Sequence, residues 1–113
     1  MDKEKLSEDF AVKIMGLEKF LRTKMHERVV SHQICKSGTS IGANISESTY
    51  AESTLDYIHK LKISQKECNE TLYWLRVLYR SNYLEENLYN ELYSDAETLM
   101  KIINSIIIKI NNK

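Results

Sequence analysis

The amino-acid sequence predicts an all-α protein that folds as an up-down-up-down antiparallel four-helix bundle. The 113 residues include no proline and only three glycines, so the chain lacks the frequent turn residues that a β-protein needs. Apolar residues recur three and four positions apart in four segments, which is the period of an amphipathic helix. Short linkers join these segments and make consecutive helices antiparallel neighbours, so we expect a single four-helix-bundle domain over residues 1–113.

The first helix is expected over residues 7–24 and the second over residues 27–46. Ser7 is a candidate N-cap for the first helix, because a serine side chain in that position accepts a hydrogen bond from a backbone N–H group. The apolar stripes are Phe10, Ile14, Leu17 and Leu21 in the first helix and Val30, Ile34, Ile41 and Ile45 in the second.

The third helix is expected over residues 54–80 and the fourth over residues 85–111. Ser53 or Thr54 is a candidate N-cap for the third helix, with Asp56 in its first turn. Both segments repeat their apolar residues about every seven positions, which favours shallow left-handed crossings between neighbouring helices. The stripes are Leu55, Ile58, Leu61, Cys68, Leu72, Leu75 and Tyr79 in the third helix and Leu88, Leu92, Ala96, Leu99, Ile103, Ile106 and Ile110 in the fourth.

The segment KSGTSIGANISES, residues 36–48, is unusual for a helix because it contains two glycines four positions apart. The segment fits a nucleotide-binding P-loop poorly, because that loop needs the spacing G-x-x-x-x-G-K-[ST] after a strand. Two glycines inside a helix cost about 1 kcal/mol each relative to alanine, and close contact with a neighbouring helix would offset this cost. We expect the Asn44 side chain to reach the interior and to be hydrogen-bonded there. The predicted helix-packing motif consists of Gly38, Ile41, Gly42, Asn44, Ile45 and Glu47.

Charge and composition exclude several classes of protein. Sixteen basic and 16 acidic side chains give a net charge of zero, which argues against a surface that is basic throughout but is compatible with a local basic patch. No segment approaches the roughly 20 apolar residues of a membrane span, and the charged opening MDKEKLSEDF is unlike a signal peptide. We therefore expect a cytoplasmic protein outside the membrane, with Cys35 and Cys68 reduced and packed as small apolar side chains.

The sequence offers little catalytic or metal-binding chemistry. Only Asp56-x-x-His59 comes near the Glu-x-x-His motif of a di-iron bundle, and no C-x-x-C pair is present to bind zinc. The nucleophile motif G-x-S-x-G is also absent. Glu47, Glu67 and Glu70 are candidates for a carboxylate cluster between the second and third helices. The alternative, which we favour, is that they pair with nearby lysines or with Asn44, or are solvated. The prediction is therefore no enzyme activity, no cofactor and no metal.

The segments SGTSIGANISES and STLDYIHKLKISQKECNETLYWL resemble a bacterial family of small four-helix-bundle proteins. Its founding members are encoded by intervening sequences in 23S ribosomal RNA genes, and a relative is the accessory variability protein of diversity-generating retroelements. The resemblance extends from about Phe10 to Ile110, and it departs from many members at Ser48, where they carry glycine. The matching residues are Ser40, Ile41, Asn44, Ile45, Glu47, Ser53, Asp56, Tyr57, Ser64 and Glu67.

The resemblance implies a homo-oligomer in which five protomers form a barrel. It also implies a link to nucleic acid, because the retroelement relative is associated with nucleic-acid binding and with a reverse transcriptase. The members encoded within ribosomal RNA genes have no settled activity. We therefore expect self-association into a pentamer, and RNA, DNA and a reverse transcriptase are the other candidate partners.

A basic pole of the bundle is the candidate nucleic-acid site. Antiparallel packing brings the ends of the first and third helices to the same pole as the start of the second, and Tyr73, Trp74 and Tyr79 lie nearby, where they would stack on bases. The alternative is that these cations complement the helix dipoles and that the acidic start of the fourth helix dilutes their field. The candidate residues are Lys19, Arg22, Lys24, Arg28, Arg76 and Arg80.

Apolar residues outside the main stripes predict self-association. A helix that is apolar most of the way round is buried on most sides, and one protomer supplies too few neighbours to bury the third and fourth helices in this way. The alternative is that the C-terminal turn packs under the first two helices. The candidate oligomer interface consists of Tyr73, Trp74, Val77, Ile107 and Ile108.

Two functions from different classes stay open. The first is a non-enzymatic oligomeric scaffold that binds RNA or DNA, with a retroelement accessory protein beside a reverse transcriptase as one form of it. The second is an assembly module whose partner is another protein and which has no nucleic-acid role.

Overall fold

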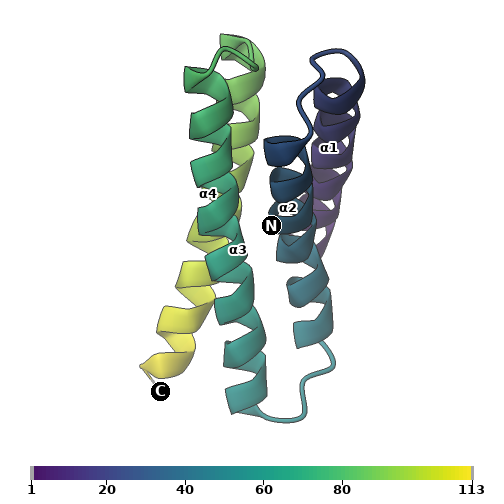
Figure 1. Cartoon of the computed structure of the whole chain (residues 1–113). Helices are drawn as coiled ribbons and strands as arrows, with labels where there is room; N and C mark the ends of the chain where they lie inside the picture. Colours follow the sequence, from purple (N-terminus) through teal and green to yellow (C-terminus); the bar gives the residue numbers. More distant parts are fainter. Residues whose placement is uncertain (1, 113) are drawn as a thin grey trace.

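The computed structural model describes residues 2–112 and contains four α-helices (Figure 1). α1 spans Lys3–Thr23, α2 spans Val29–Ser48, α3 spans Thr54–Arg80 and α4 spans Glu86–Asn111. Each helix packs against the next, α4 returns to α1, and the diagonal pairs α1–α3 and α2–α4 make no close backbone approach. The all-α fold with four helices is confirmed, and this packing order fits the antiparallel up-down-up-down bundle.

The start of α1 differs from the prediction. The helix begins at Lys3 because the side chain of Asp2 accepts hydrogen bonds from the backbone N–H groups of Glu4 and Lys5, at 3.0 and 3.1 Å. Aspartate caps a helix as well as serine does, so the helix extends four residues beyond the expected start. Ser7 therefore lies inside α1, where it is buried.

The starts of the other helices also follow their capping groups. α2 begins at Val29, two residues later than expected, because the Glu27 carboxylate accepts hydrogen bonds from the backbone N–H groups of Val29 and Ser31. α3 has the predicted bounds, and the Ser53 side chain caps it by accepting from the N–H group of Asp56 at 3.0 Å. α4 begins one residue after the expected start.

The two glycines of α2 face α1 at very short range. A Cβ atom at Gly38 would lie 3.0 Å from both Cγ atoms of Ile14, and a Cβ atom at Gly42 would lie 3.0 Å from the hydroxyl oxygen of Ser7 and 3.3 Å from its backbone carbonyl carbon. Glycine therefore lets the two helices approach more closely than any other residue would allow. This contact is the physical reason for two glycines in the middle of a helix, where each costs about 1 kcal/mol relative to alanine.

The contact between α2 and α3 is made through small polar side chains as well as apolar ones. The Ser64 hydroxyl donates to the backbone oxygen of Ile41 at 2.8 Å, and the Thr71 hydroxyl donates to the Ser37 hydroxyl at 2.9 Å. All three hydroxyl side chains are buried, so these bonds satisfy groups that would otherwise destabilise the core. The core itself consists of Phe10, Ile14, Leu17, Leu21, Ile34, Ile41, Ile45, Leu61, Cys68, Leu72, Leu75, Leu78, Leu84, Leu92, Ala96, Leu99, Ile103 and Ile107.

Two predicted apolar positions are corrected by the structure. Leu55 is 81% exposed, because it lies in the first turn of α3, at the end of the bundle where few helices surround it. Ile107, which we expected on the outer surface, is buried in the core of the single chain. A helical turn of 3.6 residues after Ile103 falls between Ile106 and Ile107, so both positions share the inward direction.

α4 separates from α1 along its C-terminal half. In Figure 1 this half of α4, drawn in yellow, leans away from α1, and α1–α4 is the pair of neighbouring helices with the least backbone contact. Two pockets lie between these helices, one beside Ile102 and Ile106 in this half and one beside Asp95 and Leu99 at the middle of α4. The interface between α1 and α4, which we call the seam, is therefore the least tightly packed contact between neighbouring helices of the bundle.

Candidate functional site

The last two turns of α3 carry a face that combines aromatic and cationic side chains. Tyr73, Arg76, Val77, Arg80 and Ser81 line one shallow pocket of about 380 Å³. Spacings of three and four place these side chains on one side of the helix. Tyr73 is 49% exposed and both arginines are exposed. We call these five residues the α3 end face.

No acidic side chain within residues 2–112 forms an ion pair with Arg76 or Arg80. Arg76 is instead held by a neutral partner, since its Nη1 donates to the hydroxyl oxygen of Tyr93 on α4 at 2.9 Å. Neither guanidinium group is therefore occupied by a carboxylate of these residues. Arginine is the side chain best suited to phosphate, because its planar group presents several N–H donors at once.

Aromatic rings fix the end of α3 against the start of α4. Tyr79 and Tyr89 stack with their ring centroids 4.2 Å apart, and Tyr89 lies 5.3 Å from Tyr93. Burial, and after it the neighbouring phenol of Tyr93, raises the pKa of Tyr89. The sequence analysis missed Tyr93 as a partner of Arg76. In the sequence, Tyr93 lies one helical turn after Tyr89, which indicates that both rings share one face of α4. Only the packing of α3 on α4 shows that Tyr93 contacts Arg76.

The residues of the predicted basic pole come from three helices. Lys19, Arg22 and Lys24 lie at the end of α1, Arg28 directly precedes α2, and Arg76 and Arg80 lie at the end of α3, which packs against α2 but not against α1. Arg22 is also engaged by Glu18, at 2.8 Å, and this hydrogen bond raises the Arg22 pKa. That these six residues form one nucleic-acid site stays a prediction.

The polar residues of the helix-packing motif do not enter the core. Asn44 is half-buried, and its side-chain amide donates to the backbone oxygen of Ser40 in its own helix at 2.8 Å, so it does not reach the interior as expected. Glu47 is exposed and lies 4.0 Å from Lys60 on α3. Ile41 and Ile45 of the same motif are fully buried. The motif therefore packs through its apolar and glycine positions and leaves its polar positions outside.

The glutamates Glu47, Glu67 and Glu70 have different surroundings in the structure. Partial burial, and after it the charge of Glu70, raises the pKa of Glu67. Glu70 accepts a hydrogen bond from the indole nitrogen of Trp74 at 3.1 Å, while Glu47 pairs with a lysine elsewhere. None of the three lines the pocket of the α3 end face or the two pockets between α1 and α4.

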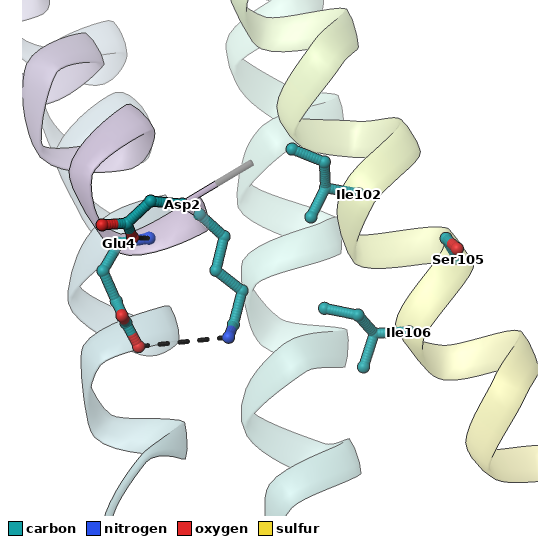
Figure 2. Close-up of a pocket in the computed structure, with 6 residues that line it drawn as sticks. Asp2, Glu4, Ile102, Ser105 and Ile106 are labelled. Atoms are coloured by element: carbon teal, nitrogen blue, oxygen red, sulfur yellow. Dashed lines mark hydrogen bonds and ion pairs between the residues drawn. The ribbon is translucent and has the colours of Figure 1, made fainter.

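The seam between α1 and α4 forms a second candidate site (Figure 2). Its pocket of about 480 Å³ has an apolar side, made by Ile102 and Ile106, and a charged side on the first turn of α1. The charges there are already engaged, because Asp2 caps the helix and Lys3 lies 4.0 Å from Glu4. The seam thus offers an apolar surface for packing.

The predicted oligomer interface is divided between the core and the surface. Tyr73 and Val77 belong to the α3 end face, and Trp74 is half-buried against the core. Ile108 is 58% exposed, whereas Ile107 is buried within the protomer and adds no outer surface. The exposed apolar surface of α4 is therefore smaller than expected from its sequence.

Potential metal ligands and the two cysteine thiols are the other groups with functional chemistry. No group of three or more His, Cys, Asp or Glu side chains within residues 2–112 has the geometry of a metal site. Cys68 is buried and its thiol donates to the backbone oxygen of Ala96 at 3.2 Å, while Cys35 is half-buried 3.6 Å from the sulfur of Met15. Burial raises the pKa of the Cys68 thiol to about 12. Among the described helices, none has an apolar stretch long enough to cross a membrane.

Comparisons with known proteins agree with this description of the fold. The family model described as 23S rRNA-intervening sequence protein matches residues 2–105. A crystal structure of a protein with unknown function from the S23 ribosomal protein family of Bacteroides thetaiotaomicron has 45% sequence identity and a TM-score of 0.93, and the match covers 94% of this chain and 98% of that one. No curated protein matches the chain at a significant level.

Proposed function

Because the chain belongs to the 23S rRNA-intervening sequence protein family, we propose that it is a non-enzymatic oligomeric scaffold that binds nucleic acid at the α3 end face. The single observation that carries the proposal is the pair of exposed arginines, one turn apart, that have no acidic partner within residues 2–112. Ion pairs within residues 2–112 engage Lys3, Lys5, Lys13, Arg22 and Lys60 but neither of these arginines. Two arginines outside these pairs and beside an exposed tyrosine favour a phosphate-bearing ligand.

The charge-reversal double variant Arg76→Glu, Arg80→Glu tests this proposal. We expect the wild-type protein to be retained by labelled RNA or heparin at low salt, with binding that falls steeply as the salt concentration rises. The double variant should lose at least tenfold in affinity, since about two phosphate contacts become repulsive. Absence of any retention of the wild-type protein at low salt would refute nucleic-acid binding.

A matched control comes from the same helix. Lys62 and Lys66 are exposed, one turn apart and earlier in α3, so Lys62→Glu with Lys66→Glu makes the same change in net charge away from the end face. Under the proposal this control keeps at least half of the wild-type affinity. An equal loss in both double variants would show that only the overall charge matters and would contradict a localised site.

Self-association is the second part of the proposal. It is supported by the exposed Ile108 and by the apolar side of the seam between α1 and α4, where Ile102 and Ile106 are half-buried. The family resemblance implies five-fold symmetry, so the mass in light scattering or sedimentation equilibrium should be that of five chains. Ile108→Glu, which removes no core contact, should shift that mass towards a single chain. A monomeric wild-type protein at micromolar concentration would refute this part.

The alternative is an assembly module with a protein partner, including a retroelement accessory role beside a reverse transcriptase. The seam between α1 and α4 is the observation that favours it, because Ile102 and Ile106 give it an apolar side on which a partner protein could pack. An oligomer of the expected mass that ignores RNA, DNA and heparin would select this alternative. A reverse transcriptase gene beside the coding sequence would then identify the partner.

A further inference from the structure

The ring of Tyr73 is held in place before any ligand arrives. It contacts Trp74 edge to face, with ring centroids 4.9 Å apart and an angle of 68° between the planes. Trp74 is itself half-buried against the core and is fixed by its hydrogen bond to Glu70. Nearly half of the Tyr73 side chain nevertheless faces solvent. A half-exposed ring on a rigid support is suited to stacking, because little side-chain entropy remains to be lost on binding.

The two arginines beside this ring are spaced along the helix axis. Four residues of α-helix rise roughly 6 Å, so the guanidinium groups of Arg76 and Arg80 can reach neighbouring phosphates of one strand. Arg76 is oriented by Tyr93, which fixes one end of this pair. Between the arginines, Val77 adds apolar surface to the same pocket. Proteins that bind unpaired strands combine cations that follow the phosphate backbone with aromatic rings on which bases stack. The α3 end face contains both.

A duplex would use only half of this surface. Its bases are stacked on one another inside the helix and present only their edges in the grooves, so a tyrosine ring has no exposed base face to cover. A single strand can turn a base outward onto the ring while its phosphates lie against the arginines. The exposed Tyr73 and the adjoining Val77 are therefore used by an unpaired strand and unused by a duplex.

On these observations, and resting on the proposed nucleic-acid binding, we propose that the ligand of the α3 end face is single-stranded nucleic acid, with a base stacked on Tyr73 and successive phosphates bound by Arg76 and Arg80. Guanidinium groups and an aromatic ring do not read the sugar, so RNA and DNA strands bind alike. The pocket spans one face of a single helix and holds only a few nucleotides. Sequence preference is correspondingly weak, because every base offers a face for stacking.

Trp74 is the only tryptophan of the chain, so it reports directly on this site. Strands of uridine or thymidine of about twelve nucleotides should change its fluorescence at low salt, and a duplex of equal length should bind about tenfold more weakly or less. The variant Tyr73→Leu should weaken single-strand binding by roughly 5- to 150-fold, the range that loss of one stacked base gives, and should leave duplex binding unchanged. Tyr73→Phe should keep single-strand affinity, because the ring and not the hydroxyl makes the contact.

The control is Tyr50→Leu, since Tyr50 is 85% exposed and lies between α2 and α3, away from the end of α3. It should bind single strands as the wild-type protein does. The proposal is overturned if duplex and single strand bind equally, or if Tyr73→Leu matches the wild-type protein while Arg76→Glu, Arg80→Glu still loses affinity; the proposed nucleic-acid binding survives both of these results. If neither strand nor duplex binds at low salt, both proposals fall together.

Discussion

The contact between Gly42 and Ser7 predicts a measurable difference between two alanine substitutions. A Cβ atom at Gly42 would lie 3.0 Å from the Ser7 hydroxyl oxygen, 3.1 Å from its Cβ and 3.3 Å from its backbone carbonyl carbon. The hydroxyl can rotate away, but the other two atoms move only with α1. By contrast, a Cβ atom at Gly16, which lies inside α1, would meet nothing within 4 Å.

Both substitutions gain the same helix propensity, about 1 kcal/mol, because each glycine lies in the interior of a helix. Only Gly42→Ala must also separate two packed helices, and overpacking of this kind costs about 1–3 kcal/mol. We therefore expect Gly16→Ala to stabilise the protein by about 1 kcal/mol. Gly42→Ala should range from nearly neutral to a loss of about 2 kcal/mol, so the two variants should differ by about 1–3 kcal/mol.

Urea denaturation followed by circular dichroism at 222 nm measures this difference directly. Thermal melts should agree, with a separation of about 4 °C for each kcal/mol in a domain of this size. Both variants must have the oligomeric mass of the wild-type protein for the comparison to hold. The reasoning is refuted if Gly42→Ala is stabilised as much as Gly16→Ala, since α1 and α2 would then have room for a methyl group.

Two further predictions concern burial. Leu75→Ala should cost about 2–5 kcal/mol in urea denaturation because Leu75 is fully buried, whereas Leu55→Ala, in the same predicted stripe, should cost less than about 0.5 kcal/mol because Leu55 is 81% exposed. Equal costs would contradict the burial described for α3. Cys68 should resist a thiol reagent at pH 8 until the protein unfolds, and Cys35 should react first, since the Cys68 thiol is buried with a pKa of about 12. Above the ordinary thiol pKa of about 9, the unfolded chain loses the Cys68 proton while the folded chain keeps it. The free energy of unfolding should therefore fall as the pH rises, and it should fall less steeply in Cys68→Ala. Equal slopes in both proteins would argue against the raised pKa.

The helices were predictable because their signals are local. Ser53 caps α3 through an N–H group three residues away, and the apolar period is a property of the helix itself. The start of α1 was missed because both Asp2 and Ser7 are capable caps, and propensity alone does not choose between them. The outcome depends on burial, since Ser7 packs against Gly42 inside the bundle.

The residues of the candidate site could be named from the sequence, but which of them lie beside one another could not. Antiparallel order places the basic residues towards one end, but it does not say which helices are neighbours and which are diagonal. The structure separates Arg22, which is bound by Glu18, from Arg76 and Arg80, which have no acidic partner within residues 2–112. It also supplies Tyr93 from another helix as the group that orients Arg76. These are contacts between segments distant in the chain, and no periodic pattern encodes them.

The sequence by itself determined that this protein is helical, that it has four helices, and that the glycines of the second helix face a close neighbour. Local hydrogen bonding, the 3.6-residue period and the cost of glycine in a helix are enough for those conclusions. Only the tertiary structure decided that the neighbour is α1, that Ile107 is inside, and that two arginines remain available beside Tyr73. The physical reason is that burial and ion pairing depend on which surfaces meet across the bundle, and the chain order alone leaves that arrangement open.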